Sequence, residues 1–444
     1  MKMLRFLGVA ALLGSTALPA WSIDLAQAYR AALQEDATLR AARATAQAGR
    51  EQLPQARAQL LPNASLSMGR NRNDLTRTAP NFLGQTTSLS EVYPSYSQTL
   101  QLRQPIYRKP LLAGYEQAKF AIEDVNAMLE FELTSVAVKV SGAYLEALLA
   151  QDQLALIRTQ KTTNTAQLDA ARKGFAAGAG TRTDVDEAQA RLDLARAQEL
   201  EAQQHVDYTQ RQLQQLINQP VNALAALDVG KLQLRPPQPV GLEAWVRMAE
   251  DGSPEIQALR ARREVARLAI EKARGAHYPT LDAIAQYTRS ASENVLSPST
   301  EYQNFSLGLQ LQVPLYSGGY VDSTVRQALA ELDRAENQLE ALRRDLGVRV
   351  HREFRGITEG IEKVHALEQA VRSAEQMVIS SRKSYQAGVR TQLDILNAEQ
   401  QRMQALRDLA QARYVVLISR IRLQALVGGD MQAVIDETNG FFRH

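Results

Sequence analysis

The fold is decided by a fourteen-residue stretch that reads RKSYQAGVRTQLDI and runs from Arg382 to Ile395. A related stretch, RKGFAAGAGTRTDV, lies 210 residues earlier, at Arg172–Val185. Seven of the seventeen residues at 172–188 are identical to their counterparts at 382–398. Such a match at one fixed offset predicts that the chain contains the same structural unit twice.

Each stretch has the residues that end one helix and begin another. Gly178 can adopt the left-handed conformation of a helix C-cap, and Thr181 can cap the next helix, with Asp184 in its first turn. The second copy has the same residues in the same order: Gly388, Thr391 and Asp394. The sequence therefore predicts two helical hairpins with their tips at Gly174–Thr183 and Gly388–Thr391.

The duplication extends well beyond the tips. Mostly small and apolar residues follow a 3-4 spacing over ten positions after each tip, and six of the ten pairs are identical. The predicted units are a first repeat at 23–220 and a second repeat at 242–427, joined by a proline-rich linker at 221–241. Residues 428–444 are a short polar tail with room for one helical turn.

Residues 1–22 have the features of a secretory signal peptide. Lys2 and Arg5 precede an apolar run, and the small-x-small triplet at 20–22 predicts cleavage before Ile23. Without these two basic residues the mature charge is (51 − 2) − 48 = +1. This near-balance argues against nucleic acid as a partner. No later stretch approaches the ~20 consecutive apolar residues of a membrane-spanning helix.

The composition excludes several kinds of site. The chain has no cysteine, which excludes disulfides, cysteine metal sites, a cysteine nucleophile and a lipid-modified amino terminus. Its five histidines lack metal-ligand spacing, and no Ser/His/Asp arrangement indicates catalysis. The glycines at 174, 178 and 180 lack the Gly-Lys-Ser/Thr of a phosphate-binding loop. We therefore expect no enzyme activity, no metal and no cofactor.

Helical and strand periodicities alternate along each repeat. Helical patterns occupy 24–61, 110–173, 183–217, 242–276, 319–386 and 392–427, with a kink expected at Pro54. The second and the fifth are far longer than ordinary globular helices. Period-two alternation predicts four strands, at 64–69, 96–107, 278–289 and 305–313. The strands are expected to be about ten residues long, separated by loops at 73–95 and 290–302.

Strands of this length can cross an outer membrane, but four strands cannot close a barrel. An open sheet edge in lipid is not viable, so several copies must pool their strands. Two copies would give eight strands and a filled interior, whereas three would give twelve and could leave a lumen. The geometry alone does not choose between the two.

The chain resembles the TolC family of outer-membrane channel proteins along almost all of its mature length. The specific signature runs from Tyr385 to Ala398 and is similar to the family's tyrosine, glycine, Thr-Arg-Thr and spaced-aspartate motif. The resemblance implies a mixed α/β membrane protein that forms a homotrimer. Its twelve-stranded β-barrel, with four strands from each chain, lies in outer-membrane lipid and continues into an α-helical coiled-coil tunnel in the periplasm.

The resemblance also implies a function and its partners. The trimer would be the exit duct of an efflux or type I secretion system, and it would conduct substrates passively to the outside. It would dock to a periplasmic adaptor protein and to an inner-membrane pump or ABC exporter. We expect the adaptor to bind the tips at Ala177, Gly178, Ala387 and Gly388, because small residues let another helical hairpin approach closely.

Two further sets of residues near the tips follow from the resemblance. Asp394 matches the first aspartate of a pair that narrows the periplasmic entrance, but the second position is Asn397, so one charged ring is expected instead of two. The family's closing contacts join an arginine and a tyrosine of the second repeat to an aspartate of the first. These positions are Arg390, Tyr385 and Asp184, and they form the expected latch.

Simpler interpretations remain for these residues. Asp394 could favour the positive end of its helix without facing a lumen. Arg390 could be a solvated charge, and Gly388 could serve only as a cap. For the whole chain, the alternative to a duct is a structural coiled-coil spacer or an adhesin anchored in the outer membrane. Conduction of ions by the purified protein distinguishes the two.

Overall fold

The computed structural model describes residues 22–294 and 297–443, so the predicted signal peptide lies outside the described residues apart from its last position. In chain order the elements are α1 (Leu25–Glu35), α2 (Ala37–Arg50), α3 (Gln52–Ala58), β1 (Asn63–Pro80), β2 (Thr86–Tyr107), α4 (Lys109–Ala176), α5 (Arg182–Ile217), α6 (Leu242–Gly252), α7 (Pro254–Arg274), η1 (Gly275–His277), β3 (Thr280–Asn294), β4 (Ser297–Gln312), α8 (Tyr320–Gln386), α9 (Gln392–Leu426) and α10 (Met431–Asn439).

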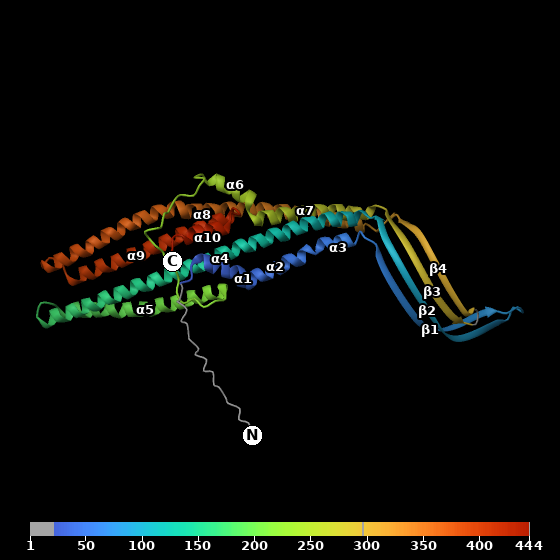
Figure 1. Cartoon of the computed structure of the whole chain (residues 1–444), viewed down its shortest axis with the longest axis horizontal. Helices are drawn as coiled ribbons and strands as arrows, with labels where there is room; N and C mark the ends of the chain where they lie inside the picture. Colours follow the sequence, from blue (N-terminus) through green and yellow to red (C-terminus); the bar gives the residue numbers. More distant parts are fainter. Residues whose placement is uncertain (1–21, 295–296, 444) are drawn as a thin grey trace, which may run out of the picture.

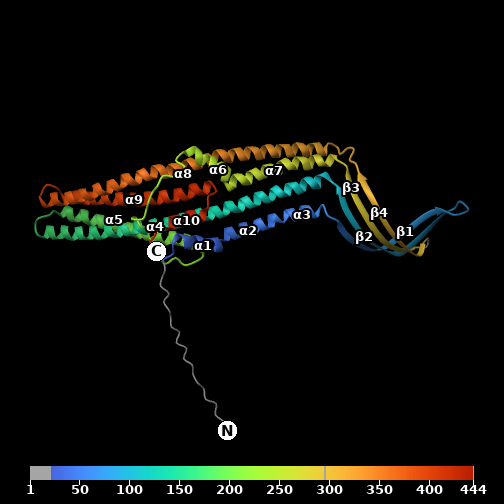
Figure 2. The same cartoon turned by 45° about the horizontal axis from the view of Figure 1, so that its top comes forward.

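The molecule is elongated, with helices at one end and the sheet at the other (Figure 1). Helices α4 and α8 have 68 and 67 residues, which corresponds to about 100 Å each at 1.5 Å per residue. Each returns through a tip into a shorter partner, α5 or α9. The two hairpins end together at the extremity farthest from the sheet (Figure 2). The predicted pair of long helical hairpins is confirmed.

The helical pattern at 24–61 is three helices rather than one. Asp24 and Asp36 cap α1 and α2, and each carboxylate accepts a backbone N–H of the following turn. The helix is interrupted again at Glu51, three residues before Pro54, which itself lies inside the short α3. All three helices contact α4, and the breaks let them follow its surface.

The four strands form one antiparallel sheet in the order β1-β2-β3-β4. They contain 18, 22, 15 and 16 residues, so the expected length of about ten was wrong. The predicted loop at 290–302 was also wrong, because β3 and β4 occupy nearly all of it; residues 295–296 lie outside the described part.

The loop predicted at 73–95 is strand as well, apart from a turn at 81–85. Strands β1 and β2 stay paired out to Pro80 and Thr86. Side chains join the strands there: the hydroxyl oxygens of Thr78 and Ser88 are 3.2 Å apart. Short polar side chains fit an antiparallel ladder when neither face needs to contact lipid, which is why polarity alone misidentified this segment.

The half of the sheet nearer the helices has one apolar and one polar face. The register aligns two adjacent apolar rows across all four strands. The row farther from the helices is Leu66, Leu100, Tyr287 and Phe305, and the row nearer to them is Ala64, Leu102, Ala285 and Leu307. The opposite face has polar rows such as Ser67, Thr99, Thr288, Asn304. Leu307 is 74% exposed in the single chain. We call the apolar rows the lipid band, since exposed leucines in adjacent rows are typical of a barrel's outer face.

Residues near both ends of the described part of the chain pack into a waist between the sheet and the tips. Tyr144 of α4 donates its hydroxyl to the backbone oxygens of Ile23, at 3.0 Å, and Ala225, at 3.2 Å. Its ring meets that of Phe442 edge to face, with centroids 5.5 Å apart. Short bridges join Ile23 to the linker and the linker to Phe442, which is fully buried. The linker and the tail are therefore parts of the core.

An ion cluster ties the sheet to the helices where the two meet. The buried carboxylate of Asp282, near the start of β3, accepts hydrogen bonds from two arginines. Arg103 Nη2 lies 2.6 Å from Oδ2, and Arg108 Nε lies 2.8 Å from Oδ1. Because Arg108 immediately precedes α4, the cluster fixes the angle at which that helix leaves the sheet.

Among the described residues, α4 is long and apolar enough to cross a membrane, contrary to the expectation that no stretch would approach this composition. One window of it reaches a mean hydropathy of 1.3. Half of that window is buried within the chain. The apolar residues of α4 thus supply core contacts, such as those of Val140 and Leu148 at the waist.

Candidate gate and docking site at the helical tips

The two tips have the same backbone geometry. Gly178 and Gly388 adopt φ angles of +72° and +74°, in the left-handed region that favours glycine. Their N–H groups donate to the backbone oxygens of Phe175, at 3.0 Å, and Tyr385, at 2.9 Å. The predicted caps are therefore present, and a Cβ atom added at either glycine would meet nothing within 4 Å. The tips offer open space to a partner.

Each following helix begins with the same reciprocal capping box. Thr181 donates its backbone N–H and its hydroxyl to Asp184 Oδ2, at 2.8 and 2.7 Å. Thr391 does the same to Asp394, at 2.9 and 2.8 Å. The Thr391 bonds, together with the Arg390 charge, lower the pKa of Asp394. Asp394 is thus part of the cap of α9, and these contacts favour its ionised form.

The duplication also extends to an interhelical contact beside each tip. In the first hairpin, Arg172 Nη2 donates to Gln189 Oε1 at 3.0 Å. In the second, Arg382 Nη2 donates to Glu399 Oε1 at 2.6 Å. The two pairs occupy equivalent positions at the shift of 210 residues. The acceptor of this contact is charged only in the second hairpin, so the contact is the stronger of the two there.

The three expected latch residues are not in contact within one chain. Arg390 Nη1 donates to the buried Ser381 Oγ at 2.8 Å, inside its own hairpin. Tyr385 is 43% exposed, and Asp184 is held in its capping box. Among residues 22–294 and 297–443, no hydrogen bond or ion pair joins Asp184 to Tyr385 or Arg390.

A contact that the sequence did not indicate connects the two hairpins instead. Arg191 of α5 donates through Nη2 to Asn397 Oδ1 of α9 at 2.8 Å. Its Nη1 donates to Gln400 Oε1, one turn further along α9. Arg191 lies outside the apolar 3-4 spacing, so no pattern in the chain singled it out. The structure thus places one expected entrance residue, Asn397, in a bond between the repeats.

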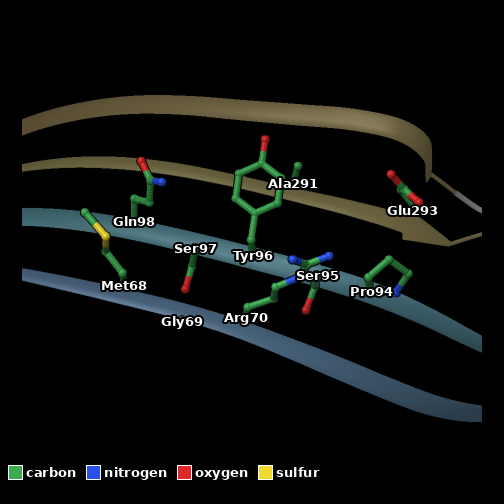
Figure 3. A pocket seen from close by; sticks show the side chains of 10 residues that line it. All are labelled: Met68, Gly69, Arg70, Pro94, Ser95, Tyr96, Ser97, Gln98, Ala291 and Glu293. Atoms are coloured by element: carbon green, nitrogen blue, oxygen red, sulfur yellow. The ribbon is translucent and has the colours of Figure 1, made fainter.

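A pocket also lies on the outer half of the sheet, far from the tips (Figure 3). Tyr96 and Gln98 project to one side of β2, and Ser95 and Ser97 project to the other (Figure 3). This alternation continues the two faces described above. In the described part of the chain, no group of His, Asp and Glu side chains is arranged to hold a metal ion.

Comparison with known proteins shows the family. The family described as outer membrane efflux protein matches residues 28–219 and 245–429. The alkaline protease secretion protein AprF of Pseudomonas aeruginosa is 34% identical over 95% of this chain and 86% of its own length. The proteases secretion protein PrtF of Dickeya chrysanthemi is 31% identical, over 92% and 89%. TolC of Escherichia coli is 30% identical, over 91% and 82%.

Solved structures share the fold. The outer membrane protein VceC of Vibrio cholerae superposes with a TM-score of 0.77 at 19% identity, covering 92% of this chain and 96% of that one. The outer-membrane channel OprN gives 0.79 at 18% identity, covering 92% and 90%. These relatives are channels and secretion proteins, which does not favour a spacer or an adhesin. The chain therefore belongs to the outer membrane efflux protein family and is a TolC-type outer-membrane channel protein whose helices extend into the periplasm.

Proposed function

We propose that three copies of this chain form one duct. The observation that carries the proposal is the open sheet: β1 and β4 each pair on one side only within the chain. A membrane-spanning sheet with two open edges is not viable in lipid. Three copies pool twelve strands, and the lipid band then encircles the barrel while the polar face lines a lumen. Each copy also adds the two hairpins of its 23–220 and 242–427 repeats to the tunnel.

We propose that the duct serves the secretion of a protein through a type I system. Two of the relatives described above are named for the secretion of proteases. The tips would dock a periplasmic adaptor at Ala177, Gly178, Ala387 and Gly388, and the adaptor would connect the duct to an ABC exporter. Support comes from the two glycines, whose surroundings are open.

The cargo can be tested in a strain that lacks its own protease-secretion channel. Expressed together with that strain's exporter and adaptor, this chain should restore protease to the medium. A small-molecule efflux strain without its channel should remain sensitive to dyes. If this chain instead restored resistance to dyes and did not restore protease to the medium, the duct would belong to an efflux pump.

We further propose that one set of contacts which closes the entrance forms between protomers. Asp394 would give one charged ring beside the neutral Asn397. Because Asp184, Tyr385 and Arg390 lie apart within a chain, their expected latch would form with a neighbouring copy. The exposure of Tyr385 supports this arrangement, since a neighbour can reach its hydroxyl. Ion conduction by the purified protein in a planar bilayer tests the duct itself, and a protein that never conducts would argue for the spacer.

A further inference from the structure

Arg191 is the side chain near the tips that joins the two hairpins of one chain. In the described ranges, three hydrogen bonds connect the α4–α5 hairpin to the α8–α9 hairpin. One of them, from Tyr414 to Asp152, lies toward the waist. The other two are made by the single guanidinium of Arg191, to Asn397 and Gln400. These acceptors are three residues apart and share one face of α9, which suits the planar fork of an arginine.

The backbone that carries Arg191 is itself held in place. Asn164 of α4 donates its side-chain N–H to the backbone oxygen of Arg191 at 3.1 Å. Asn164 is only 5% exposed, so its amide is fixed by packing. A guanidinium mounted on an anchored backbone loses less conformational entropy when it binds. The α5 backbone at Arg191 is therefore fixed against α4, and the side chain reaches toward α9 from that fixed point.

The acceptors Asn397 and Gln400 are exposed, but the stretch of α9 that carries them is anchored to α8. Glu399 of α9 lies between Asn397 and Gln400 and is 5% exposed. Its carboxylate accepts from Arg382 of α8 at 2.6 Å and from Arg402 at 3.1 Å. The polar contacts thus run from α4 through α5 and α9 to α8. An outward movement of the second hairpin that is larger than the arginine side chain can follow must break both Arg191 bonds.

We propose that Arg191, Asn397 and Gln400 form a gating clamp that closes the channel within each protomer, independently of the contacts expected from Asp184, Tyr385 and Arg390. The clamp uses neutral acceptors, so its bonds are weaker than those of an arginine to a carboxylate. This explains what Asn397 does in this chain: it keeps the clamp releasable. An aspartate there would bind Arg191 more tightly and resist opening. The proposal deepens the proposed duct and rests on it only for its conductance readout.

Two readouts test the clamp on the purified full-length protein. The first is single-channel conductance in a planar bilayer. Arg191→Ala should increase the open population on the order of tenfold, because a charged hydrogen bond is lost in every copy. Arg196→Ala is the matched control, since Arg196 lies on the same helix and pairs only with Asp193 within it. Arg191→Glu should also open the channel, and Gln400→Arg added to it should restore closure.

The second readout is the distance between spin labels on the tips, introduced as Ala177→Cys and Ala387→Cys in this cysteine-free chain. Arg191→Ala should shift the distances to longer values, and Asn397→Asp should narrow their distribution. Unchanged conductance and unchanged distances in Arg191→Ala, at normal trimer yield, would overturn the clamp. Longer distances in a protein that never conducts would support the clamp and refute the duct.

Discussion

Tyr414 donates its hydroxyl to Asp152 Oδ2 at 2.7 Å, and this bond joins the second repeat to the first near the waist. Tyr414 is almost completely buried. Burial raises the pKa of Asp152, while the Tyr414 bond and the Arg413 charge oppose the rise. The fold therefore holds a carboxyl group where its charged form is disfavoured relative to the unfolded chain.

Asp152→Asn should raise thermal stability at pH 7. Because the folded pKa of Asp152 is raised, its stabilising contribution is present below the unfolded pKa of about 3.9 and is lost as the pH rises through the folded value. Asparagine still accepts the Tyr414 hydroxyl. The gain in melting temperature should therefore shrink toward pH 4. Tyr414→Phe, in contrast, should cost about 1–3 kcal/mol at pH 7 by leaving the carboxylate unpaired. A destabilised Asp152→Asn protein at pH 7 would contradict the assignment.

Gly360→Ala should destabilise the second hairpin. A Cβ atom at Gly360 would lie 2.6 Å from Cγ2 of Val416, a buried β-branched residue of α9 that has little room to move. Overpacking of this kind costs about 1–3 kcal/mol. Gly347→Ala in the same helix is the control, because a Cβ there meets nothing within 4 Å. The control should be neutral or slightly more stable in thermal denaturation. Equal melting temperatures for the two variants would show that α8 and α9 are farther apart.

Arg390→Ser combined with Tyr385→Phe should raise conductance without lowering trimer yield. An exposed ion pair contributes only ~0–1 kcal/mol, but three copies act together, and each ~1.4 kcal/mol changes the open population about tenfold. Single-channel recording measures the effect. No change in conductance at normal trimer level would remove these residues from the gate.

Asp394→Asn should weaken block by multivalent cations while leaving conductance nearly unchanged. Asparagine can still accept hydrogen bonds from Thr391 at the start of α9, so the cap is kept while the charge is lost. Titration of the blocking cation in the bilayer measures the affinity. Block of undiminished affinity would place the carboxylate away from the lumen.

Ala387→Trp should stop export while folded trimer stays in the membrane. Ala387 lies at an exposed tip and has no left-handed backbone angle, so a large side chain obstructs a partner without straining the chain. Ala387→Ser is the control, because serine is nearly as small as alanine. Secreted protease and heat-resistant trimer are measured together. Normal export by the tryptophan variant would exclude docking at this tip.

Surface labelling tests the direction of the chain in the membrane. Leu83 lies at the exposed turn between β1 and β2, and Gly178 lies at the opposite extremity. A maleimide that does not enter cells should label Leu83→Cys in intact cells and should label Gly178→Cys only after the outer membrane is permeabilised. Labelling of Gly178→Cys in intact cells would reverse the topology.

The sequence predicted best those features that are local and repeated. The caps at Gly178 and Gly388 depend on backbone preferences within a few residues, and the duplication supplied a second instance of each. The lengths of β1 and β2 could not be predicted, because hydroxyl-rich segments are equally compatible with loops until their cross-strand partners are known. The waist was missed for a similar reason: Ile23 and Phe442 pair with a linker that has no periodicity of its own. Arg191 depends on the approach of two hairpins, which only tertiary structure determines.

The lipid band ends at Leu66 and Phe305, yet β1 continues to Pro80 and β2 begins at Thr86. The β1–β2 hairpin therefore extends about 45 Å past the apolar rows at ~3.4 Å per residue, less where it curves, whereas β3 ends at Asn294. A molecule that leaves the outer end of the barrel is released into water at a distance from the acyl chains. To dissolve in the membrane again it must diffuse back through bulk solvent and the headgroup layer. Because the barrel opens at this distance from the acyl chains, an exported molecule is diluted in water before it can enter the membrane again.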